Sequence, residues 1–164
     1  MKFAIQPVRC AFHGPLGAMT LAAQDKALVG VWFDGQRHQP DPSNWQQDET
    51  HPVLRAAATQ LQQYFAGERH RFELPLALDS GTVFQQKVWR ALLEIASGST
   101  LSYGAVSQAI GQVSAVRAVA AAIGRNPLSI VVPCHRVVGA NGALTGYAGG
   151  LDRKAALLQL ESPI

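Results

Sequence analysis

The chain of 164 residues is poor in cysteine and in charge, and these shortages exclude several classes of protein. Its two cysteines, Cys10 and Cys134, form no C-x-x-C pair, and no H-E-x-x-H motif is present, so the sequence has no local metal signature. A site built from distant Cys10 and His13 stays open. No apolar run is long enough to span a bilayer, and the first residues break too early for a signal peptide. We therefore expect a cytoplasmic protein with reduced thiols and no membrane partner.

Acidic residues are missing from one long stretch, because none occurs between Glu94 and Asp152. Residues 1–80 hold seven Lys and Arg against eight Asp and Glu, whereas residues 81–164 hold seven against three. Three arginines lie in the acid-free stretch: Arg117, Arg125 and Arg136. A polyanion would meet no carboxylate repulsion there. A core segment rich in Ala and Gly would give the same pattern, so charge alone leaves both interpretations open.

Hydrophobic patterning divides the chain into a β-rich first part and a helical second half. The first part is expected to contain three strands, a helix and an extended segment, at residues 3–8, 16–23, 27–33, 52–66 and 72–78. Asp79-Ser80-Gly81 is the best boundary, and Thr82 with Gln85 has the spacing of a capping box that begins a helix. The sequence therefore predicts an α/β (α+β) fold. It has a small N-terminal α/β lobe with a β-sheet over residues 1–80 and a mainly helical C-terminal lobe over residues 81–164.

Two short helices joined by a Gly-containing turn give the second half a helix-turn-helix pattern. Ser102 is predicted to cap a helix over residues 103–110, and Ser114 one over residues 115–123. The second helix is rich in alanine and carries Arg117 in its first turn. Such a helix can approach a DNA duplex closely, but alanine suits packing against another helix equally well. The pattern alone leaves DNA binding open.

A reactive thiol is predicted in residues 130–138. The β-branched run at residues 130–132 is typical of a buried strand, and Pro133 would end its hydrogen-bond ladder. Cys134 would then lie at the end of a strand beside His135, where an imidazole can activate a thiol. A lone cysteine is more often an inert, buried, small hydrophobic residue. Neighbours on a strand point to opposite faces, so a direct Cys–His pair would need a kink.

The last part of the chain contains two further candidate residues, Tyr147 and Glu161. A glycine-rich segment over residues 139–150 lacks the spacing of a phosphate cradle, and Tyr147 within it favours a pocket wall over a plain surface loop. An amphipathic helix is predicted over residues 152–160. Glu161 at its end is one of only three acids in the second half of the chain.

These segments together resemble the signature of the O6-alkylguanine-DNA alkyltransferases, the methylated-DNA–protein-cysteine methyltransferases. The motifs that carry the resemblance are Pro133-Cys134-His135-Arg136-Val137-Val138, Asn126-Pro127, Ser102-Tyr103-Gly104 and Gly146-Tyr147-Ala148-Gly149-Gly150-Leu151. The resemblance is close over residues 81–161 and loose before them. It implies a ribonuclease H-like supporting domain over residues 1–80 and a helix-turn-helix, DNA-binding and alkyl-acceptor domain over residues 81–164.

The resemblance implies direct-reversal DNA repair by a protein that acts once. An O6-alkylguanine, or an O4-alkylthymine, is flipped out of double-stranded DNA bound through its minor groove, and Cys134 irreversibly accepts the alkyl group. No cofactor, metal or methyl donor is implied. A monomer is expected, and cooperative assembly on DNA stays open. The implied DNA-binding residues are Arg117, Ser102, Ala118 and Arg125. The implied alkylguanine pocket consists of Tyr103, Val137, Tyr147 and Ala148.

The same resemblance assigns catalytic roles to five residues: Cys134, His135, Glu161, Tyr103 and Asn126. Cys134 would be linked through a water to His135, and His135 to Glu161, which orients the imidazole and stabilises its cationic form. Tyr103 would donate to the leaving base, and Asn126 would fix the turn between the DNA-contacting helix and the nucleophile.

The DNA side has its own implied roles. Arg117 would occupy the stack that the flipped base leaves. Backbone groups at Cys134, Val137 and Ala148 would read the guanine edge, with Tyr147 as a wall. Some relatives carry a hydroxyl where Ala148 stands, so this chain would rely on the backbone amide there.

Two other classes of function remain as alternatives at this stage. A cysteine hydrolase could use Cys134 and His135 directly, but that interpretation leaves Arg117 and the acid-free stretch unexplained. A DNA-binding regulator with a structural Cys134 is the second alternative, and it leaves Tyr103 and Glu161 without a role.

Overall fold

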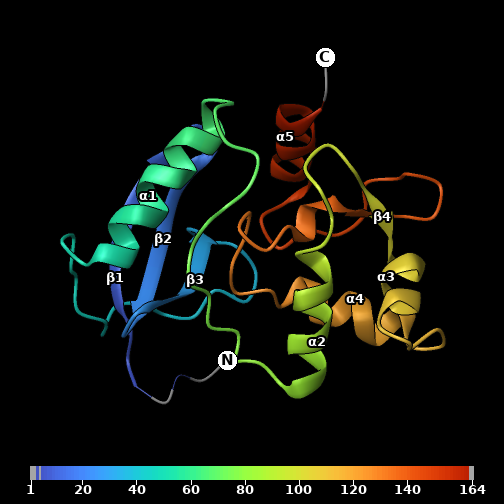
Figure 1. Ribbon diagram of the computed structural model, residues 1–164, viewed down its shortest axis with the longest axis horizontal. Coiled ribbons are helices and arrows are strands. Elements are labelled where there is room, and N and C mark those ends of the chain that lie inside the picture. The colour runs from blue at the N-terminus through green and yellow to red at the C-terminus, as the bar shows by residue number, and fades with distance from the viewer. Residues whose placement is uncertain (1–2, 4, 163–164) are drawn as a thin grey trace.

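The computed structural model describes residues 3 and 5–162 and shows two lobes side by side (Figure 1). The N-terminal lobe is an antiparallel sheet in the order β1-β2-β3, with a helix across one face. Its elements are β1 (Val8–Gly14), β2 (Gly17–Gln24), β3 (Ala27–Phe33) and α1 (Pro52–Phe65). The C-terminal lobe is mainly helical, with one short parallel strand pair. Its elements are α2 (Val83–Leu92), β4 (Leu101–Ser102), α3 (Tyr103–Ala109), α4 (Val116–Gly124), η1 (Cys134–Arg136), β5 (Val137–Val138) and α5 (Leu151–Glu161).

This architecture confirms the predicted α+β fold. The second and third strands, the helix that follows them, the helix-turn-helix and the last amphipathic helix form where the patterning indicated them. The Thr82 hydroxyl accepts from the Gln85 amide, and the Gln85 side chain accepts from the Thr82 amide, which completes the capping box of α2. No helix in the described part of the chain combines the length and apolar character needed to cross a membrane.

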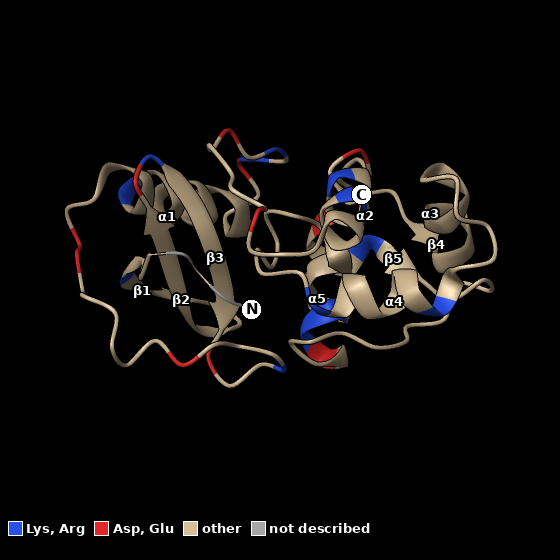
Figure 2. Ribbon diagram, turned by 90° about the horizontal axis from the view of Figure 1, so that it is seen from below, with Lys and Arg blue, Asp and Glu red and all other residues tan. Residues whose placement is uncertain are grey.

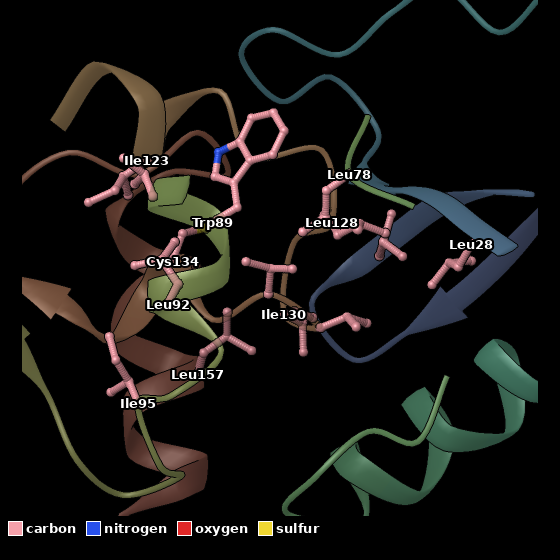
Figure 3. Packing of buried hydrophobic residues seen from close by; sticks show 14 of the residues in the cluster. Leu28, Leu78, Trp89, Leu92, Ile95, Ile123, Leu128, Ile130, Cys134 and Leu157 are labelled. Atoms are coloured by element: carbon pink, nitrogen blue, oxygen red, sulfur yellow. The ribbon is translucent and has the colours of Figure 1, made fainter. Parts of the chain in front are cut away.

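One hydrophobic core runs through both lobes. Its residues come from the sheet, α1, α2, α4 and the segment before Cys134, and Cys134 itself belongs to it. Figure 3 shows Leu28 of β3 and Leu128 on one side of this cluster, and Trp89 and Leu92 of α2 on the other. The Trp89 indole also donates to the Ala122 carbonyl of α4 at 2.8 Å, so α2 holds the second helix of the helix-turn-helix by a buried hydrogen bond.

The outer edge of β3 joins the lobes through backbone hydrogen bonds. The Val31 amide donates to Pro127 O at 2.8 Å, and the Ser129 amide donates to Val31 O at 2.9 Å. These bonds extend the sheet by one bridge into the C-terminal lobe, between Val31 and Leu128. A free sheet edge is thereby closed, and the turn that follows α4 is fixed to β3.

The predicted strand over residues 130–132 is wrong, because the chain makes consecutive tight turns there. Ile130 has a φ of +71°, and the Val132 amide donates to Leu128 O at 2.8 Å. The apolar run reflects burial rather than extension, since Ile130 is 1% exposed and Val132 fully buried. A short buried apolar run does not by itself distinguish a strand from other buried conformations. The strand of this region is β5, which pairs in parallel with β4.

Two further predictions fail at element boundaries. The first strand begins at Val8 and not at residue 3; residue 4 of the predicted range lies outside the described residues. β1 is a half-exposed edge strand, and the polar side chains of Arg9 and His13 hide its apolar alternation. Ser114 does not cap α4, because the cap residue is Ala115, which makes no side-chain cap bond. The Ser102 hydroxyl, in contrast, accepts from the Ala105 amide at 3.0 Å and caps α3 as predicted.

Helix α1 begins at an unusual cap, which yields a test of stability. His51 Nδ1 accepts from the Val53 amide at 3.2 Å, and Nε2 lies 2.9 Å from Asp25 O, so the Nε2–H tautomer satisfies both contacts. We expect His51→Ala to lower the free energy of unfolding by about 1 kcal/mol, the usual worth of an N-cap. His51→Asn restores a capping side chain and should lose less. Denaturant unfolding measures the difference, and equal stability of all three proteins would contradict the assignment.

Candidate active site

Cys134 is the first residue of η1 and lies where the core meets a pocket. Its side chain is packed in the hydrophobic cluster and the residue is 6% exposed (Figure 3). A cavity of about 500 Å³ opens in front of it. Residues from α4, the N-terminal lobe and the glycine-rich segment line this pocket: Arg37, His38, Tyr103, Ala120, Ala121, Ile123, Gly124, Cys134, Thr145, Gly146, Tyr147 and Ala148. A larger cleft of about 1100 Å³ touches Pro133 and Arg136 but does not include Cys134.

His135 and Glu161 lie in direct contact behind the thiol. His135 Nε2 is 2.8 Å from Glu161 Oε2, and the imidazole is fully buried. Because a carboxylate only accepts, Nε2 carries the hydrogen and Nδ1 carries the lone pair. His135 Nδ1 is buried and has no hydrogen-bond partner among the described residues. His135 therefore keeps one unused hydrogen-bond acceptor, Nδ1, inside the core. We call the His135–Glu161 pair the relay.

The carboxylate of Glu161 accepts from two more side chains. The Arg136 guanidinium donates to both oxygens, through Nε to Oε1 at 2.8 Å and through Nη2 to Oε2 at 2.9 Å. Tyr64 of α1 donates its hydroxyl to Oε2 at 2.6 Å, from the other lobe. Arg136 also donates to Ile95 O at 2.6 Å. These bonds compensate for burying a charge, which is otherwise costly.

The protonation states follow from burial and from these partners. Burial lowers the pKa of His135 despite the opposing influence of Glu161, so the imidazole is neutral near pH 7. Burial alone would raise the pKa of Glu161, but hydrogen bonds from Arg136 and His135 outweigh it and hold that pKa at about 2. Burial raises the pKa of Cys134, against the influence of Asn126 and Lys154. The site thus holds a protonated thiol at Cys134 and a neutral imidazole at His135.

Asn126 holds the turn that carries the chain from α4 to Cys134. Its side-chain amide donates to Val132 O at 2.8 Å, and its carbonyl accepts from the Leu128 amide at 3.0 Å. The residue is 4% exposed, so these bonds are shielded from water. Asn126 therefore fixes the turn that leads to Cys134.

The glycine-rich pocket loop is held from two sides. Tyr103 donates its hydroxyl to Thr145 O at 2.9 Å. Lys154 of α5, fully buried, donates to Thr145 O at 2.8 Å and to Gly146 O at 3.2 Å. The loop needs no side chains of its own for this anchoring, because only its carbonyls are used. Tyr147 and Ala148 are thereby kept on the pocket wall.

The structure separates the predicted DNA-binding residues into exposed and engaged ones. Arg117 and Ala118 are exposed on α4, and Arg125 is exposed at the end of that helix. The Ser102 hydroxyl is occupied as the cap of α3. Figure 2 shows most red segments around the N-terminal lobe and none on α3 and α4, so the helix that carries exposed Arg117 has no acidic residue.

Two sequence expectations need correction here. Arg136 was counted toward the positive surface, but it is 6% exposed and paired with Glu161, so it cannot meet a polyanion. Val137 was expected in the pocket, but it is fully buried in β5 and is not among the lining residues. The first expectation came from the acid-free stretch and the second from the family resemblance, whereas η1 and β5 bury both residues in the core.

Sequence reasoning missed Tyr64 and Lys154, and it misjudged Arg136. Tyr64 had no signal, because its partner Glu161 lies 97 positions away and in the other lobe. A lysine on the apolar side of a predicted amphipathic helix could have marked Lys154 as a buried cation. The described residues contain no group of three or more His, Cys, Asp or Glu placed to hold a metal ion.

A direct cysteine–histidine pair is not formed in the described structure. Nε2 of His135 is taken by Glu161, and Nδ1 has no side-chain partner. The hydrolase alternative required that direct contact and is not favoured. The geometry provides a buried thiol, Cys134, at a pocket and the neutral imidazole of the next residue, His135. Helix α4, which has no acidic residue, lines the same pocket.

Comparison with known proteins agrees with this arrangement. Residues 83–163 match the family described as 6-O-methylguanine DNA methyltransferase, DNA binding domain, and residues 10–78 match its ribonuclease-like domain. The methylated-DNA–protein-cysteine methyltransferase of Mycobacterium tuberculosis is 48% identical over 147 residues, which cover 90% of this chain and 87% of the relative. That of Methanosarcina acetivorans is 48% identical over 151 residues, covering 92% and 95%. A crystal structure of Mycobacterium tuberculosis OGT in complex with DNA superposes with a TM-score of 0.88 at 45% identity and covers 94% of this chain and 92% of its own.

The fold and the buried cysteine relay thus define the class of cysteine-dependent alkyl acceptors with a helix-turn-helix. The chain belongs to the 6-O-methylguanine DNA methyltransferase family.

The buried relay predicts how stability depends on pH. A folded-state pKa below the unfolded value of 6.5 means that His135 binds its proton more readily when the chain is unfolded. Stability should therefore be complete above about pH 6.5 and fall below it by up to about 1.4 kcal/mol per pH unit. The depressed pKa of Glu161 adds a second loss between pH 4.5 and about 2.

Urea unfolding of the wild type and of His135→Gln between about pH 5 and pH 7.5 tests the first of these losses. His135→Gln should be less stable at pH 7 but depend less on pH. His70→Gln, at an exposed position, is the control and should follow the wild type. An unchanged slope in His135→Gln would contradict the assignment.

Proposed function

We propose that this protein repairs O6-alkylguanine, and by the same chemistry O4-alkylthymine, in double-stranded DNA by taking the alkyl group onto Cys134. The observation that carries the proposal is a buried thiol that faces a pocket of about 500 Å³ while a His135–Glu161 relay stands behind it. Family membership supports the reaction class, since the relatives are named methylated-DNA–protein-cysteine methyltransferases. The protein acts once, because a thioether has no ready route back to the thiol. A cytoplasmic, monomeric protein without a cofactor stays a prediction from the sequence.

The proposed proton path starts at the thiol. Cys134 gives its proton through a bridging water to His135 Nδ1, the buried acceptor that no described side chain fills. The imidazolium is then stabilised by Glu161, whose low pKa keeps it ionised throughout. The His135 imidazolium keeps its hydrogen bond to the ionised Glu161. This stabilisation explains how the Cys134 thiol can become a thiolate although burial raises its pKa.

The alkyl transfer is a displacement at carbon. The sulfur attacks the alkyl carbon, the bond from carbon to O6 breaks, and its electron pair stays on the guanine. Tyr103, at the pocket wall, is the hydrogen-bond donor that we assign to the leaving base; its hydroxyl donates to Thr145 O in the absence of a base. Backbone groups of Cys134 and Ala148 are assigned to the guanine edge, with Tyr147 as the wall.

Base flipping is assigned to α4. This helix presents Arg117 and Ala118 to the outside and lines the pocket with Ala120 and Ala121. Small side chains let the helix lie close to the minor groove, and Arg117 then fills the space of the extruded base. The domain division at residues 79–81 belongs to the same proposal: residues 1–80 support, and residues 81–164 bind DNA and accept the alkyl group.

Intact mass spectrometry tests the reaction. After incubation with a duplex oligonucleotide that contains O6-methylguanine, the protein should gain one methyl group, which peptide mapping should place on Cys134. Cys134→Ser should gain none, whereas Cys10→Ser should react like the wild type. A protein that binds the duplex but stays unmodified would indicate the regulator alternative. Turnover of an ester or peptide by Cys134 would indicate the hydrolase.

The wedge assignment is tested by comparing two substrates. Arg117→Ala should slow transfer from the duplex by about tenfold, or about 1.4 kcal/mol out of a flipping cost of a few kcal/mol. Transfer from the free base O6-benzylguanine, which needs no flipping, should keep its rate. Arg90→Ala removes an exposed arginine from α2 and serves as the matched control. Equal losses with both substrates would overturn the role of Arg117.

A further inference from the structure

The N-terminal lobe contributes an arginine and a histidine to the mouth of the Cys134 pocket. Arg37 and His38 follow β3, and both line the cavity together with Cys134 and residues of α4. Arg125, at the end of α4, completes the group from the other lobe, and it lies close enough to His38 to act on it electrostatically. No role in DNA recognition was expected of the N-terminal lobe from the sequence.

The segment that carries these two side chains is held in place by hydrogen bonds. The Arg37 amide donates to Ala148 O at 3.0 Å, which ties it to the pocket loop. Gln36 is buried, and its side-chain oxygen accepts from the Phe33 amide at 2.8 Å and from the Ser129 hydroxyl at 3.1 Å. The position of residues 36–38 next to the pocket therefore does not depend on the Arg37 side chain.

The backbone at His38 is also strained. Its φ of +64° lies in the left-handed region, which costs a residue with a side chain on the order of 1 kcal/mol. Non-glycine residues in such conformations gather at functional sites, where surrounding contacts hold them in place. The surrounding contacts thus hold the loop in a conformation that is unfavourable for the isolated segment.

The cations at the pocket mouth have no carboxylate partner in the described structure. Ion pairs among the described residues are confined to Glu161, and the pocket lining contains no Asp or Glu. Arg37, His38 and Arg125 are all exposed. Burial and the charges of Arg125 and Arg37 lower the pKa of His38, so the positive charges here are those of the two arginines. An anion near them would be stabilised by both.

We infer that Arg37, with Arg125 opposite, binds a backbone phosphate of the flipped nucleotide. This inference rests on the proposed function. A guanine inside the pocket is joined to its own phosphates by a single ribose, so those phosphates must lie at the pocket mouth. Arginine suits the contact, because its planar guanidinium donates two parallel hydrogen bonds to phosphate oxygens. The N-terminal lobe thereby becomes part of the DNA-binding surface.

The salt dependence of binding tests the inference. Duplex DNA containing O6-methylguanine is titrated with Cys134→Ser protein, alone and combined with Arg37→Ala, at several salt concentrations. Loss of one phosphate contact should reduce the slope of log Kd against log salt by about 0.9. The same loss should weaken binding by about fivefold near 0.15 M salt, the value of one released counterion.

Two substitutions control for charge and for the general field. Arg37→Lys keeps the cation and should keep the slope, while Arg55→Ala removes an exposed arginine from α1 and should leave both slope and Kd unchanged. All three variants keep the amide that bonds to Ala148. A wild-type slope in Arg37→Ala, or an equal change in Arg55→Ala, would overturn the inference.

A separate readout distinguishes failure of this inference from failure of the proposed function. With Cys134 intact, Arg37→Ala should still take one methyl group from the duplex, and its rate with free O6-benzylguanine should fall less than its rate with the duplex, because the free base carries no phosphate. Loss of the free-base reaction would mean that Arg37 maintains the pocket itself, which would also overturn the inference. Absence of methyl transfer in the wild type would instead refute the proposed function.

Discussion

The structure depends on one buried carboxylate. Glu161 accepts hydrogen bonds from Tyr64 of the N-terminal lobe and from His135 and Arg136 beside the nucleophile. Removing such an acceptor would leave a buried guanidinium without compensation, which typically costs several kcal/mol. The same carboxylate holds the imidazole of His135, which follows Cys134 in the chain. Under the proposed function, stability and chemistry therefore meet at this one group, and the phenol of Tyr64 links the N-terminal lobe to it.

The joint between the lobes explains why the nucleophile is so well placed. The edge of β3 pairs with the turn after α4, and Asn126 binds that turn from within. The position of Cys134 thus depends on backbone contacts with a sheet that contributes none of the proposed catalytic side chains. The rigid segment after β3, which carries Arg37, belongs to the same joint, since its Gln36 bonds to Ser129. A supporting lobe and a reactive lobe share one continuous hydrogen-bonded seam.

Local chemistry made much of the fold predictable. The capping residues Thr82 and Ser102 marked their helices correctly, since a cap is a contact between residues three positions apart. Residues 130–132 misled the prediction, because burial and strand formation favour the same β-branched residues. In the site, motif resemblance indicated His135 and Glu161, whereas Tyr64 reaches the relay from the other lobe. Contacts across 97 positions leave no periodic signal, so only the folded chain shows them.

Helix α5 carries three residues that make contacts at the site and between the lobes: Arg153, Lys154 and Glu161. Arg153 stacks on Phe33 at 4.5 Å, Lys154 grips the carbonyls of the pocket loop, and Glu161 holds the relay. A shift or rotation of this one helix would therefore alter lobe docking, pocket width and thiol activation together.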